Sequence, residues 1–276
     1  MKKMLFTLLI FCSFYAKVGE WVDVDQMNLS RFYTDAPKTY LLSFPGSGNT
    51  WLRYCLEYLT KRPTLEMRTE KITKINCPFG YWFDMQTDYN KLPIWKVHYI
   101  DQMKMMGTFD SQQETLIVIV RNPKEALPRI FNLLSRRNKN RSLDNPTAKE
   151  LFNNTLTMNY FDILKLYDEW CPDKRHLIYY EDLITQPEQV FKKLLNFLNV
   201  SPEYLDDFMA QYDEHKLASL SMYEKQEDTS LTKGEKTKHH ALLVSSDERR
   251  KLDLYIAHVF PHIWQKYLKL RYAENR

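Results

Sequence analysis

Glycine and cysteine are scarce in this chain of 276 residues, which contains 6 Gly, 4 Cys and 12 Pro. So little glycine and proline excludes collagen-like and low-complexity architectures, and no internal repeat occurs at the periods of solenoid proteins. The cysteines are too few for a disulfide framework and lack the paired C-x-x-C spacing of a zinc site. With 44% apolar and 27% charged residues, the composition is that of an ordinary globular protein.

The excess of positive charge is also small, with a formal net charge of +4. A dedicated nucleic-acid-binding protein carries a strong basic stripe, so we do not expect nucleic acid as a partner. The basic run at 136–141 (Arg-Arg-Asn-Lys-Asn-Arg) has two interpretations. It could contact an acidic acceptor such as a glycan, although a solvated loop is the more common structure for such a run.

An extended apolar run occurs near the N-terminus. Two lysines precede apolar residues 4–15, and Ala16 then offers a small residue, an order typical of an export signal. The run is shorter than the ~20 residues that span a membrane. We therefore expect residues 1–16 to be a signal peptide or short signal-anchor, and 17–276 to form a single domain. Membrane contact would require a retained anchor, and a buried N-terminal strand or helix would instead indicate a cytoplasmic protein.

Short apolar runs and stretches of helical spacing follow one another along the chain. Residues 40–44 predict a buried strand, and apolar residues three and four apart predict a helix over 50–59. At 116–120, five apolar, mostly β-branched residues suit a strand buried on both faces of a parallel sheet. An Asn-Pro pair favours a helix start at 123, and Pro128 is expected to kink or break that helix.

The alternation continues to the end of the chain. Further strands are expected at 93–97 and 177–180, and further helices at 148–170, 187–198, 202–212, 247–260 and 263–270. A loop with short elements is expected at 65–90, and a polar loop at 221–240. Such alternation is typical of βαβ units, so we predict an α/β fold with a parallel sheet and helices on both faces. Ligands of these sheets bind beyond the carboxyl ends of the strands. This rule places the loop at 45–50, His98 and Arg121 at one edge.

The turn between the first strand and the first helix is rich in glycine. Residues 44–51 are Phe-Pro-Gly-Ser-Gly-Asn-Thr-Trp. A glycine loop that leads into a helix presents backbone N–H groups to an anion, and Ser47 and Thr50 add hydroxyl donors. The loop lacks the lysine of a Walker A motif, which argues against an ATPase or kinase. A purely structural turn is the alternative, but the flanking strand and helix favour anion binding.

Four ordered pieces of the chain resemble the sulfotransferases that use 3′-phosphoadenosine 5′-phosphosulfate (PAPS). The glycine loop is similar to the family's 5′-phosphosulfate loop, whose usual form is Tyr/Phe-Pro-Lys-Ser-Gly-Thr-Thr-Trp. Lys-Val-His at 96–98 is similar to its Lys-Thr-His, 119–125 to its 3′-phosphate segment, and 179–183 to its Tyr-Glu-Asp-Leu. The resemblance covers about residues 39–200, and its variants are closest to the sulfotransferase domains of WSC-domain proteins.

The resemblance implies a P-loop NTPase-like architecture and a pose for PAPS. The glycine loop would hold the 5′-phosphosulfate, Trp51 and Tyr180 would contact the adenine, and Arg121 would take the 3′-phosphate, which suits a guanidinium fork. Sulfuryl transfer in this family needs no metal. The residues expected to bind PAPS are Pro45, Gly46, Ser47, Gly48, Asn49, Thr50, Trp51, Arg121, Arg129, Tyr180, Lys233 and Gly234.

The chain departs from the family's pattern at three places. Gly46 stands where the family has a lysine that steadies the bridging oxygen as the sulfuryl group leaves. Some cation should still offset the charge that develops there, and the candidates are Lys96 and then Arg53. Arg129 replaces the usual serine, and it would either bind the same 3′-phosphate or face solvent. Lys233 and Gly234 match only part of the family's Arg-Lys-Gly.

His98 is the candidate general base for the acceptor hydroxyl, because a histidine with an ordinary pKa of ~6.5 suits that step near neutral pH. A lone histidine is more often a surface or core residue, but its place in the Lys-x-His match favours catalysis. The sequence thus predicts transfer of a sulfuryl group to a hydroxyl, on a carbohydrate in preference to a tyrosine or phenol. A catalytically silent PAPS-binding protein and another nucleotide-dependent transferase are the alternatives.

Overall fold

The computed structural model describes residues 37–62, 64–67, 75–76, 92–106, 110–137, 146–224 and 245–273. The predicted signal segment at 1–16, the Lys233-Gly234 pair and residues 138–141 of the basic run lie outside these ranges. None of the helices within them has both the length and the apolar character needed to cross a membrane.

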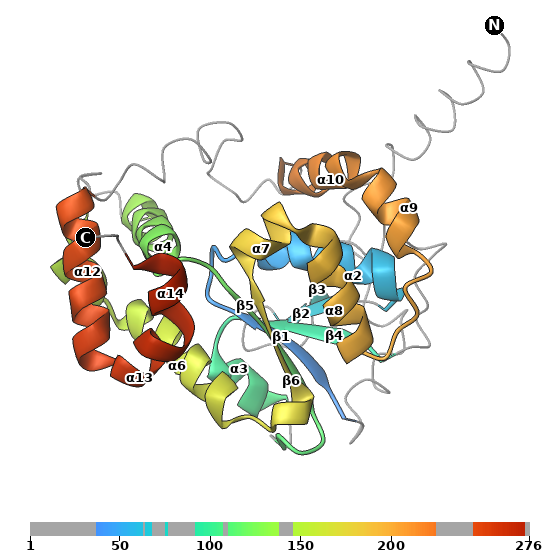
Figure 1. The fold of residues 1–276 in the computed structure, drawn as a ribbon, viewed down its shortest axis with the longest axis horizontal. Helices are drawn as coiled ribbons and strands as arrows, with labels where there is room; N and C mark the ends of the chain where they lie inside the picture. The colour runs from blue at the N-terminus through green and yellow to red at the C-terminus, as the bar shows by residue number, and fades with distance from the viewer. Residues whose placement is uncertain are drawn as a thin grey trace, which may run out of the picture.

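A sheet runs through the centre of the molecule, and its order across the described strands is β3-β2-β4-β1-β5-β6 (Figure 1). The strands are β1 (Thr39–Ser43), β2 (Thr64–Met67), β3 (Ile75–Asn76), β4 (Ile94–Val97), β5 (Thr115–Val120) and β6 (Arg175–Tyr179). Strands β2, β4, β1, β5 and β6 pair in parallel, whereas β3 pairs with β2 antiparallel. The predicted parallel sheet is confirmed.

Helices cover both faces of this sheet, as predicted. They are α2 (Asn49–Thr60), α3 (Ile100–Met105), α4 (Pro123–Arg137), α5 (Ala148–Phe152), α6 (Thr155–Glu169), α7 (Tyr180–Thr185), α8 (Pro187–Phe197), α9 (Leu205–Ala210), α10 (Tyr212–Glu224), α12 (Ser246–Val259), α13 (Pro261–Ile263) and α14 (Lys269–Tyr272). A short 3₁₀ helix (Pro172–Lys174) precedes β6, and a π-helix (Trp264–Leu268) joins α13 to α14. Figure 1 shows α4, α6 and α12–α14 on one side and α2 and α7–α10 on the other.

Each face of the sheet has its own apolar core. Leu42 of β1 packs in a cluster with Phe161 of α6 and Leu252 of α12. The neighbouring Leu41 points to the opposite face, where it joins a cluster that includes Phe191 of α8 and Phe208 of α9. Burial on both faces explains why the central strands are continuous apolar runs rather than alternating ones.

One helix prediction is wrong because of local polar contacts, and one of the two outcomes expected at Pro128 does not occur. The segment predicted as one helix at 148–170 is two helices, α5 and α6, with a turn at Asn153 and Asn154. At this turn the Thr157 hydroxyl donates to the carbonyl of Leu151, a side-chain bond that competes with the helical pattern. The break expected at Pro128 does not occur, since α4 continues through it to Arg137. A proline ring removes one helical hydrogen bond, and the rest of α4 is maintained.

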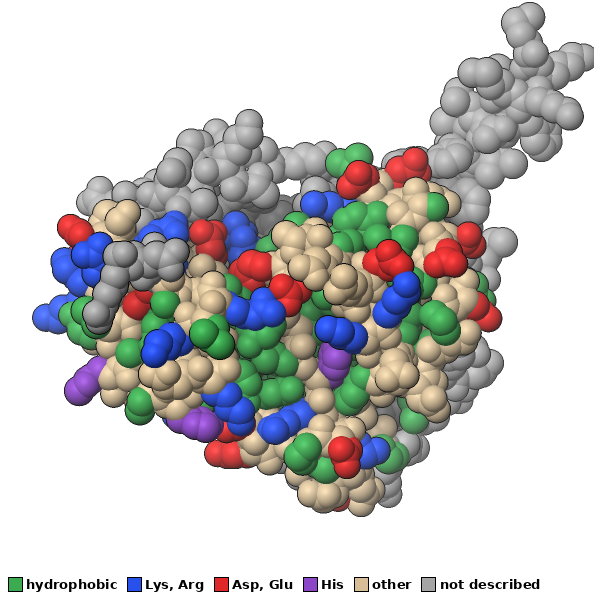
Figure 2. Space-filling model, in the orientation of Figure 1, with side chains coloured by type: hydrophobic (Ala, Val, Ile, Leu, Met, Phe, Trp, Pro, Cys, Tyr) green, Lys and Arg blue, Asp and Glu red, His purple; other side chains and the backbone are tan. Residues whose placement is uncertain are grey.

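Smaller differences occur near the end of β6 and beyond. Tyr180 begins α7 rather than ending the strand. The helix predicted at 202–212 is the shorter α9, followed by α10, which extends into the segment at 221–240 that was expected to be a loop. On the surface drawn in Figure 2, described Lys and Arg side chains are interspersed with Asp and Glu, in keeping with the net charge of +4.

Candidate functional site

The carboxyl ends of three adjacent strands bring the predicted site residues to one edge of the sheet. Because β1 lies between β4 and β5 in parallel register, Leu42 pairs with Val97 and Ser43 pairs with Ile119. The glycine loop follows β1, His98 follows β4, and Arg121 follows β5. The topology therefore places these three features side by side, where α/β proteins bind their ligands.

The glycine loop turns sharply from β1 into α2. The Ser47 N–H donates to the carbonyl of Phe44 at 3.2 Å, and Gly46 and Gly48 have φ values of 83° and 91°. Left-handed backbone of this kind favours glycine, which has no Cβ. Gly48 is the N-cap of α2, and Ser47 is buried beside it. The first N–H groups of a helix have no partner within it, so the loop ends in a set of donors suited to an anion.

Tyr180 and Arg121 pack against this loop. The ring of Tyr180 lies so close to Gly48 that a Cβ there would come within 2.3 Å of Cδ2 and 2.5 Å of Cε2. The guanidinium of Arg121 lies over the same ring, 4.3 Å from its centroid, and its Nη1 is 3.4 Å from the carbonyl oxygen of Gly46. The loop, an aromatic ring and a cation therefore form one packed group.

Arg129 also lies beside the loop, with its aliphatic stem near Gly46. A Cβ at Gly46 would be 3.8 Å from Cβ and 3.9 Å from Cδ of Arg129. Burial and the neighbouring Arg121 lower the pKa of Arg129, and Glu125 opposes that change. Glu125 is 3.8 Å from Arg121. Two guanidinium groups thus share one region, and an anion placed between them would reduce their repulsion.

Several buried polar atoms around the loop lack a hydrogen-bond partner within the part of the chain that the structure describes. Four of them can donate, namely Oγ of Ser47, Nε1 of Trp51, Nε of Arg121 and Nε of Arg129, whereas Oδ1 of Asn49 is an acceptor. A buried donor without an acceptor costs about 1–3 kcal/mol. An anionic ligand at the loop would supply acceptors for such donors, so these residues fit a phosphate-bearing molecule.

His98 is held in one orientation by β1. Its Nδ1 is 2.8 Å from the carbonyl oxygen of Ser43 and 3.3 Å from Oγ of the same residue. Because a carbonyl oxygen only accepts, Nδ1 carries the proton, and Nε2 is the basic nitrogen. The Ser43 hydroxyl also accepts a hydrogen bond of 2.8 Å from Nδ2 of Asn49. His98 and the start of α2 are therefore joined through Ser43.

Lys96 lies on β4, two residues before His98. Alternation along the strand puts Lys96 on the same face as Ile94, which belongs to the apolar core beneath α2. Lys96 is buried, and it pairs in register with Leu41 of β1. Its side chain thus lies on the face of the sheet from which α2 and the glycine loop begin.

Arg53 does not fit its predicted role as a cation at the leaving group. Its side chain is 1% exposed, and it donates to Oγ1 of Thr64 at 3.0 Å and to the carbonyl of Thr64 at 2.9 Å. Thr64 begins β2, at the amino edge of the sheet and opposite the glycine loop. Glu57 accepts from the backbone N–H of Thr64 at 2.8 Å, and burial raises its pKa to about 7 although Arg53 opposes the rise. Arg53 is therefore a structural link between α2 and β2.

Trp51 belongs to an aromatic cluster that the sequence did not predict. Its ring stacks on Tyr54 with centroids 5.7 Å apart, and it meets Tyr212 edge-on at 5.5 Å. Phe208 lies 6.2 Å away at a tilt. Trp51 is buried, so any base that it contacts must lie along the margin of this cluster. The helical spacing of Trp51 and Tyr54 in α2 was the available signal, whereas the partners on α9 and α10 are far away in sequence.

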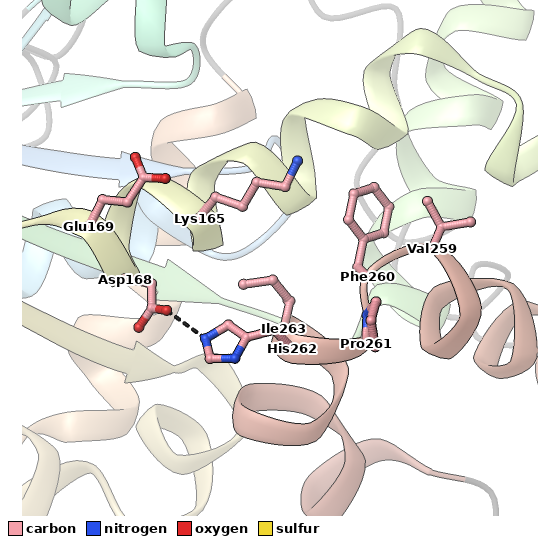
Figure 3. Close-up of a pocket in the computed structure, with 8 residues that line it drawn as sticks. All are labelled: Lys165, Asp168, Glu169, Val259, Phe260, Pro261, His262 and Ile263. Atoms are coloured by element: carbon pink, nitrogen blue, oxygen red, sulfur yellow. Dashed lines mark hydrogen bonds and ion pairs between the residues drawn. The ribbon is translucent and has the colours of Figure 1, made fainter.

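A separate pocket of about 260 Å³ lies away from this edge, between the end of α6 and α13 (Figure 3). It is lined by Lys165, Asp168, Glu169, Val259, Phe260, Pro261, His262 and Ile263. Asp168 accepts from Nε2 of His262 at 2.6 Å and from the Tyr267 hydroxyl at 2.7 Å. Burial acts to raise the pKa of Asp168, but these bonds and one from Lys266 hold it well below its usual range. The carboxylate is thus occupied in joining α6 to the C-terminal helices.

Comparison with known proteins decides the family. The family model described as "Sulfotransferase domain" matches residues 36–268. The chain belongs to the sulfotransferase family. It is therefore an enzyme of the sulfotransferase type, whose general reaction is sulfuryl transfer, and a search of the curated proteins finds no matching relative.

Several solved structures are similar to this sulfotransferase, and that of mouse SULT7A1 supports its fold. Mouse sulfotransferase SULT7A1 complexed with PAP is 17% identical, with a TM-score of 0.59 over 90% of this chain and 94% of that one. A sulfotransferase from Alicyclobacillus acidocaldarius is 14% identical, with a TM-score of 0.45 over 84% and 96% of the two chains. Retinol dehydratase in complex with androsterone and inactive cofactor PAP is 14% identical, with a TM-score of 0.44 over 68% of each chain.

The contact between Gly48 and Tyr180 predicts different costs for the two loop glycines. Replacing Gly48 by alanine should lower the free energy of unfolding by about 2–4 kcal/mol, because strain at positive φ is added to overpacking against the ring. Gly46→Ala is the matched control: its φ is similar, but its nearest neighbours are 3.8–4.0 Å away. Its cost should be only about 1–2 kcal/mol. Urea denaturation measures both, and equal losses would contradict the packing described.

The position of Arg53 predicts a loss of stability when it is replaced. Arg53→Leu leaves the buried Glu57 without its cation and should cost about 3–5 kcal/mol. The pKa of Glu57 is already raised to about 7 in the folded state, so folding binds protons and stability falls as pH rises towards that value. The variant's deficit should therefore be larger at pH 8 than at pH 5 in urea denaturation. If Arg53→Leu kept its stability but lost sulfuryl transfer, Arg53 would have the catalytic role that the sequence predicted.

Proposed function

We propose that this sulfotransferase takes the sulfuryl group of PAPS and places it on an acceptor hydroxyl. The observation that carries the proposal is the set of buried donors on Ser47, Arg121 and Arg129 around one glycine loop. PAPS has phosphate at one end and phosphosulfate at the other, and both are acceptors. The strand, glycine loop and helix together support the P-loop-like character expected from the sequence.

The arrangement of the site suggests which of these residues binds each part of PAPS. The loop N–H groups, Ser47 and Thr50 would hold the 5′-phosphosulfate at the N-terminus of α2. The two arginines flank the loop and suit the 3′-phosphate, since guanidinium groups bind phosphate oxygens in pairs. Tyr180, which already lies between the loop and Arg121, would contact the base together with Trp51.

Catalysis in this proposal depends on a proton acceptor and on charge stabilisation. With Nδ1 committed to the carbonyl of Ser43, Nε2 of His98 takes the proton of the acceptor hydroxyl as that oxygen attacks sulfur. The S–O bond to the phosphate breaks in the same displacement, and the N–H groups of the loop, Thr50 and Lys96 offset the charge left on the phosphate. Positioning and electrostatics would supply most of the acceleration, as in phosphoryl transfer.

The acceptor and the compartment belong to the proposal as well. A carbohydrate hydroxyl is our first choice, supported by the signal-like segment at 1–16 and by the resemblance of the motifs to WSC-domain sulfotransferases. Export to a Golgi-type lumen would place the enzyme where PAPS is supplied. Membrane attachment would follow only if the segment is kept as an anchor.

The role of His98 predicts a selective loss of turnover. With radiolabelled PAPS and a panel of glycans and small hydroxyl compounds, His98→Ala should lower kcat by roughly 10²–10⁴-fold, the usual contribution of general acid–base catalysis. The affinity for 3′-phosphoadenosine 5′-phosphate (PAP) should stay within about twofold, because His98 is not expected to contact it. His258→Ala, at an exposed position of α12, is the matched control. Full activity of His98→Ala would remove it from the mechanism.

The arginine pair predicts recognition of the 3′-phosphate. Calorimetry should find PAP bound more tightly than adenosine 5′-monophosphate (AMP), which lacks that phosphate. In Arg121→Ala, the ratio of the Kd for AMP to the Kd for PAP should fall at least about tenfold, because hydrogen bonds to charged groups contribute about 1.5–3 kcal/mol. Arg129→Ser should weaken PAP in the same direction. PAP binding without turnover on any acceptor would favour a silent binding protein, and a preference for ATP with magnesium would favour another transferase.

A further inference from the structure

Arg121 is proposed to bind the 3′-phosphate and Tyr180 to contact the base. A hydrogen bond between the residues that follow them in sequence connects the two. Arg121 and Tyr180 stand at the ends of the adjacent strands β5 and β6, and the guanidinium lies over the ring. Next to them in sequence, Oε1 of Glu181 accepts the backbone N–H of Asn122 at 3.0 Å. The carboxylate of Glu181 therefore joins the residues that directly follow Arg121 and Tyr180.

The second oxygen of this carboxylate is held by the C-terminal segment. Oε2 of Glu181 accepts the hydroxyl of Tyr272 at 2.6 Å. Tyr272 ends α14 and is 7% exposed. Burial and the adjacent Glu181 raise the pKa of Tyr272 far above its ordinary value. The tyrosine thus stays protonated and donates to Glu181 at any pH at which the enzyme works.

Independent contacts fix Tyr272 itself. Nζ of Lys124, a buried residue of α4, binds the carboxylate of Asp253 at 3.0 Å and also donates to the carbonyl of Tyr272. The neighbouring Arg271 forms a two-point contact with Asp182, at 2.8 and 2.7 Å. The end of α14 is therefore held by two further contacts, one with Lys124 near Asn122 and one with Asp182, the neighbour of Glu181 in α7.

We propose that Tyr272 is a positioning residue, which acts through Glu181 to hold Arg121 against Tyr180 in the geometry that binds a 3′-phosphate. This inference rests on the proposed function, because it assigns the 3′-phosphate to Arg121. Tyr272 itself would touch neither co-substrate nor acceptor. Its effect should appear as selectivity between nucleotides that differ only in the 3′-phosphate, which general destabilisation would not alter.

The experiment uses the full chain and two probes, PAP and AMP. Tyr272→Phe removes one hydroxyl and keeps the buried ring. Calorimetry should show the Kd for PAP rising about tenfold, while the Kd for AMP stays within about twofold, because tenfold corresponds to the loss of one hydrogen bond of about 1.4 kcal/mol. Equal weakening of both nucleotides, or unchanged PAP affinity, would overturn the inference.

The chain offers a matched control in Tyr267. This residue is 8% exposed, lies in the same C-terminal region, and donates its hydroxyl to the carboxylate of Asp168 at 2.7 Å. Tyr267→Phe should therefore lower the thermal midpoint about as much as Tyr272→Phe does, but leave the ratio of PAP to AMP affinity unchanged. If Tyr267→Phe also changed that ratio, the effect of Tyr272→Phe would be explained by lost stability alone, and the assigned role of Tyr272 would be overturned.

A second variant tests the same bridge from its other end. Glu181→Gln removes the charge of the carboxylate and should also weaken PAP selectively. Its effect should not add fully to that of Tyr272→Phe, since both changes weaken one connection. Additive losses would contradict the route through Glu181. If Tyr272→Phe does not fold, Glu181→Gln alone answers the question with the same pair of probes. Failure of the unmodified enzyme to bind PAP would instead reject the proposed function, and this inference with it.

Discussion

The contact between the ring of Tyr180 and the backbone of Gly48 is the constraint on which the arrangement of the site depends. Because no side chain fits at position 48, the loop after β1 can lie directly against the first residue of α7. The ring in turn packs against the guanidinium of Arg121. The backbone carbonyl of Arg121 accepts a hydrogen bond of 2.6 Å from the Tyr160 hydroxyl. Three strand ends are thereby held in one group by packing rather than by charge pairing alone.

Ser43 has a comparable importance on the other side of the loop. It is the last residue of β1, with its carbonyl facing His98 and its hydroxyl facing Asn49. A single buried residue therefore sets the tautomer of the candidate base and anchors the first turn of α2. Placing both functions on a central strand gives them the rigidity that precise chemistry needs.

The parts of the fold that follow from local pattern could be predicted, and those that depend on distant partners could not. The run at 116–120 identified β5 because burial on both faces demands continuous apolar residues. Strand β2 has only four residues and no clear period, so the sequence indicated short elements in this region but not a strand that begins at Thr64. Without Thr64 at its start, nothing in the sequence could show that Arg53 turns away from the loop. Similarly, the break at Asn153 depends on side-chain bonds that spacing does not reveal.

The bond between Tyr272 and Glu181 joins residues 91 positions apart, and this has a consequence for how the molecule is made. Synthesis delivers the amino end first, so β1, the glycine loop and β5 can pair well before α14 exists. The arginine side of the site, however, acquires its contact with Tyr272 only after α14 has been made and has closed a long loop against the sheet. Support of the arginine side therefore depends on contacts of high sequence separation, which cost more loop-closure entropy than the local contacts of the core strands and helices.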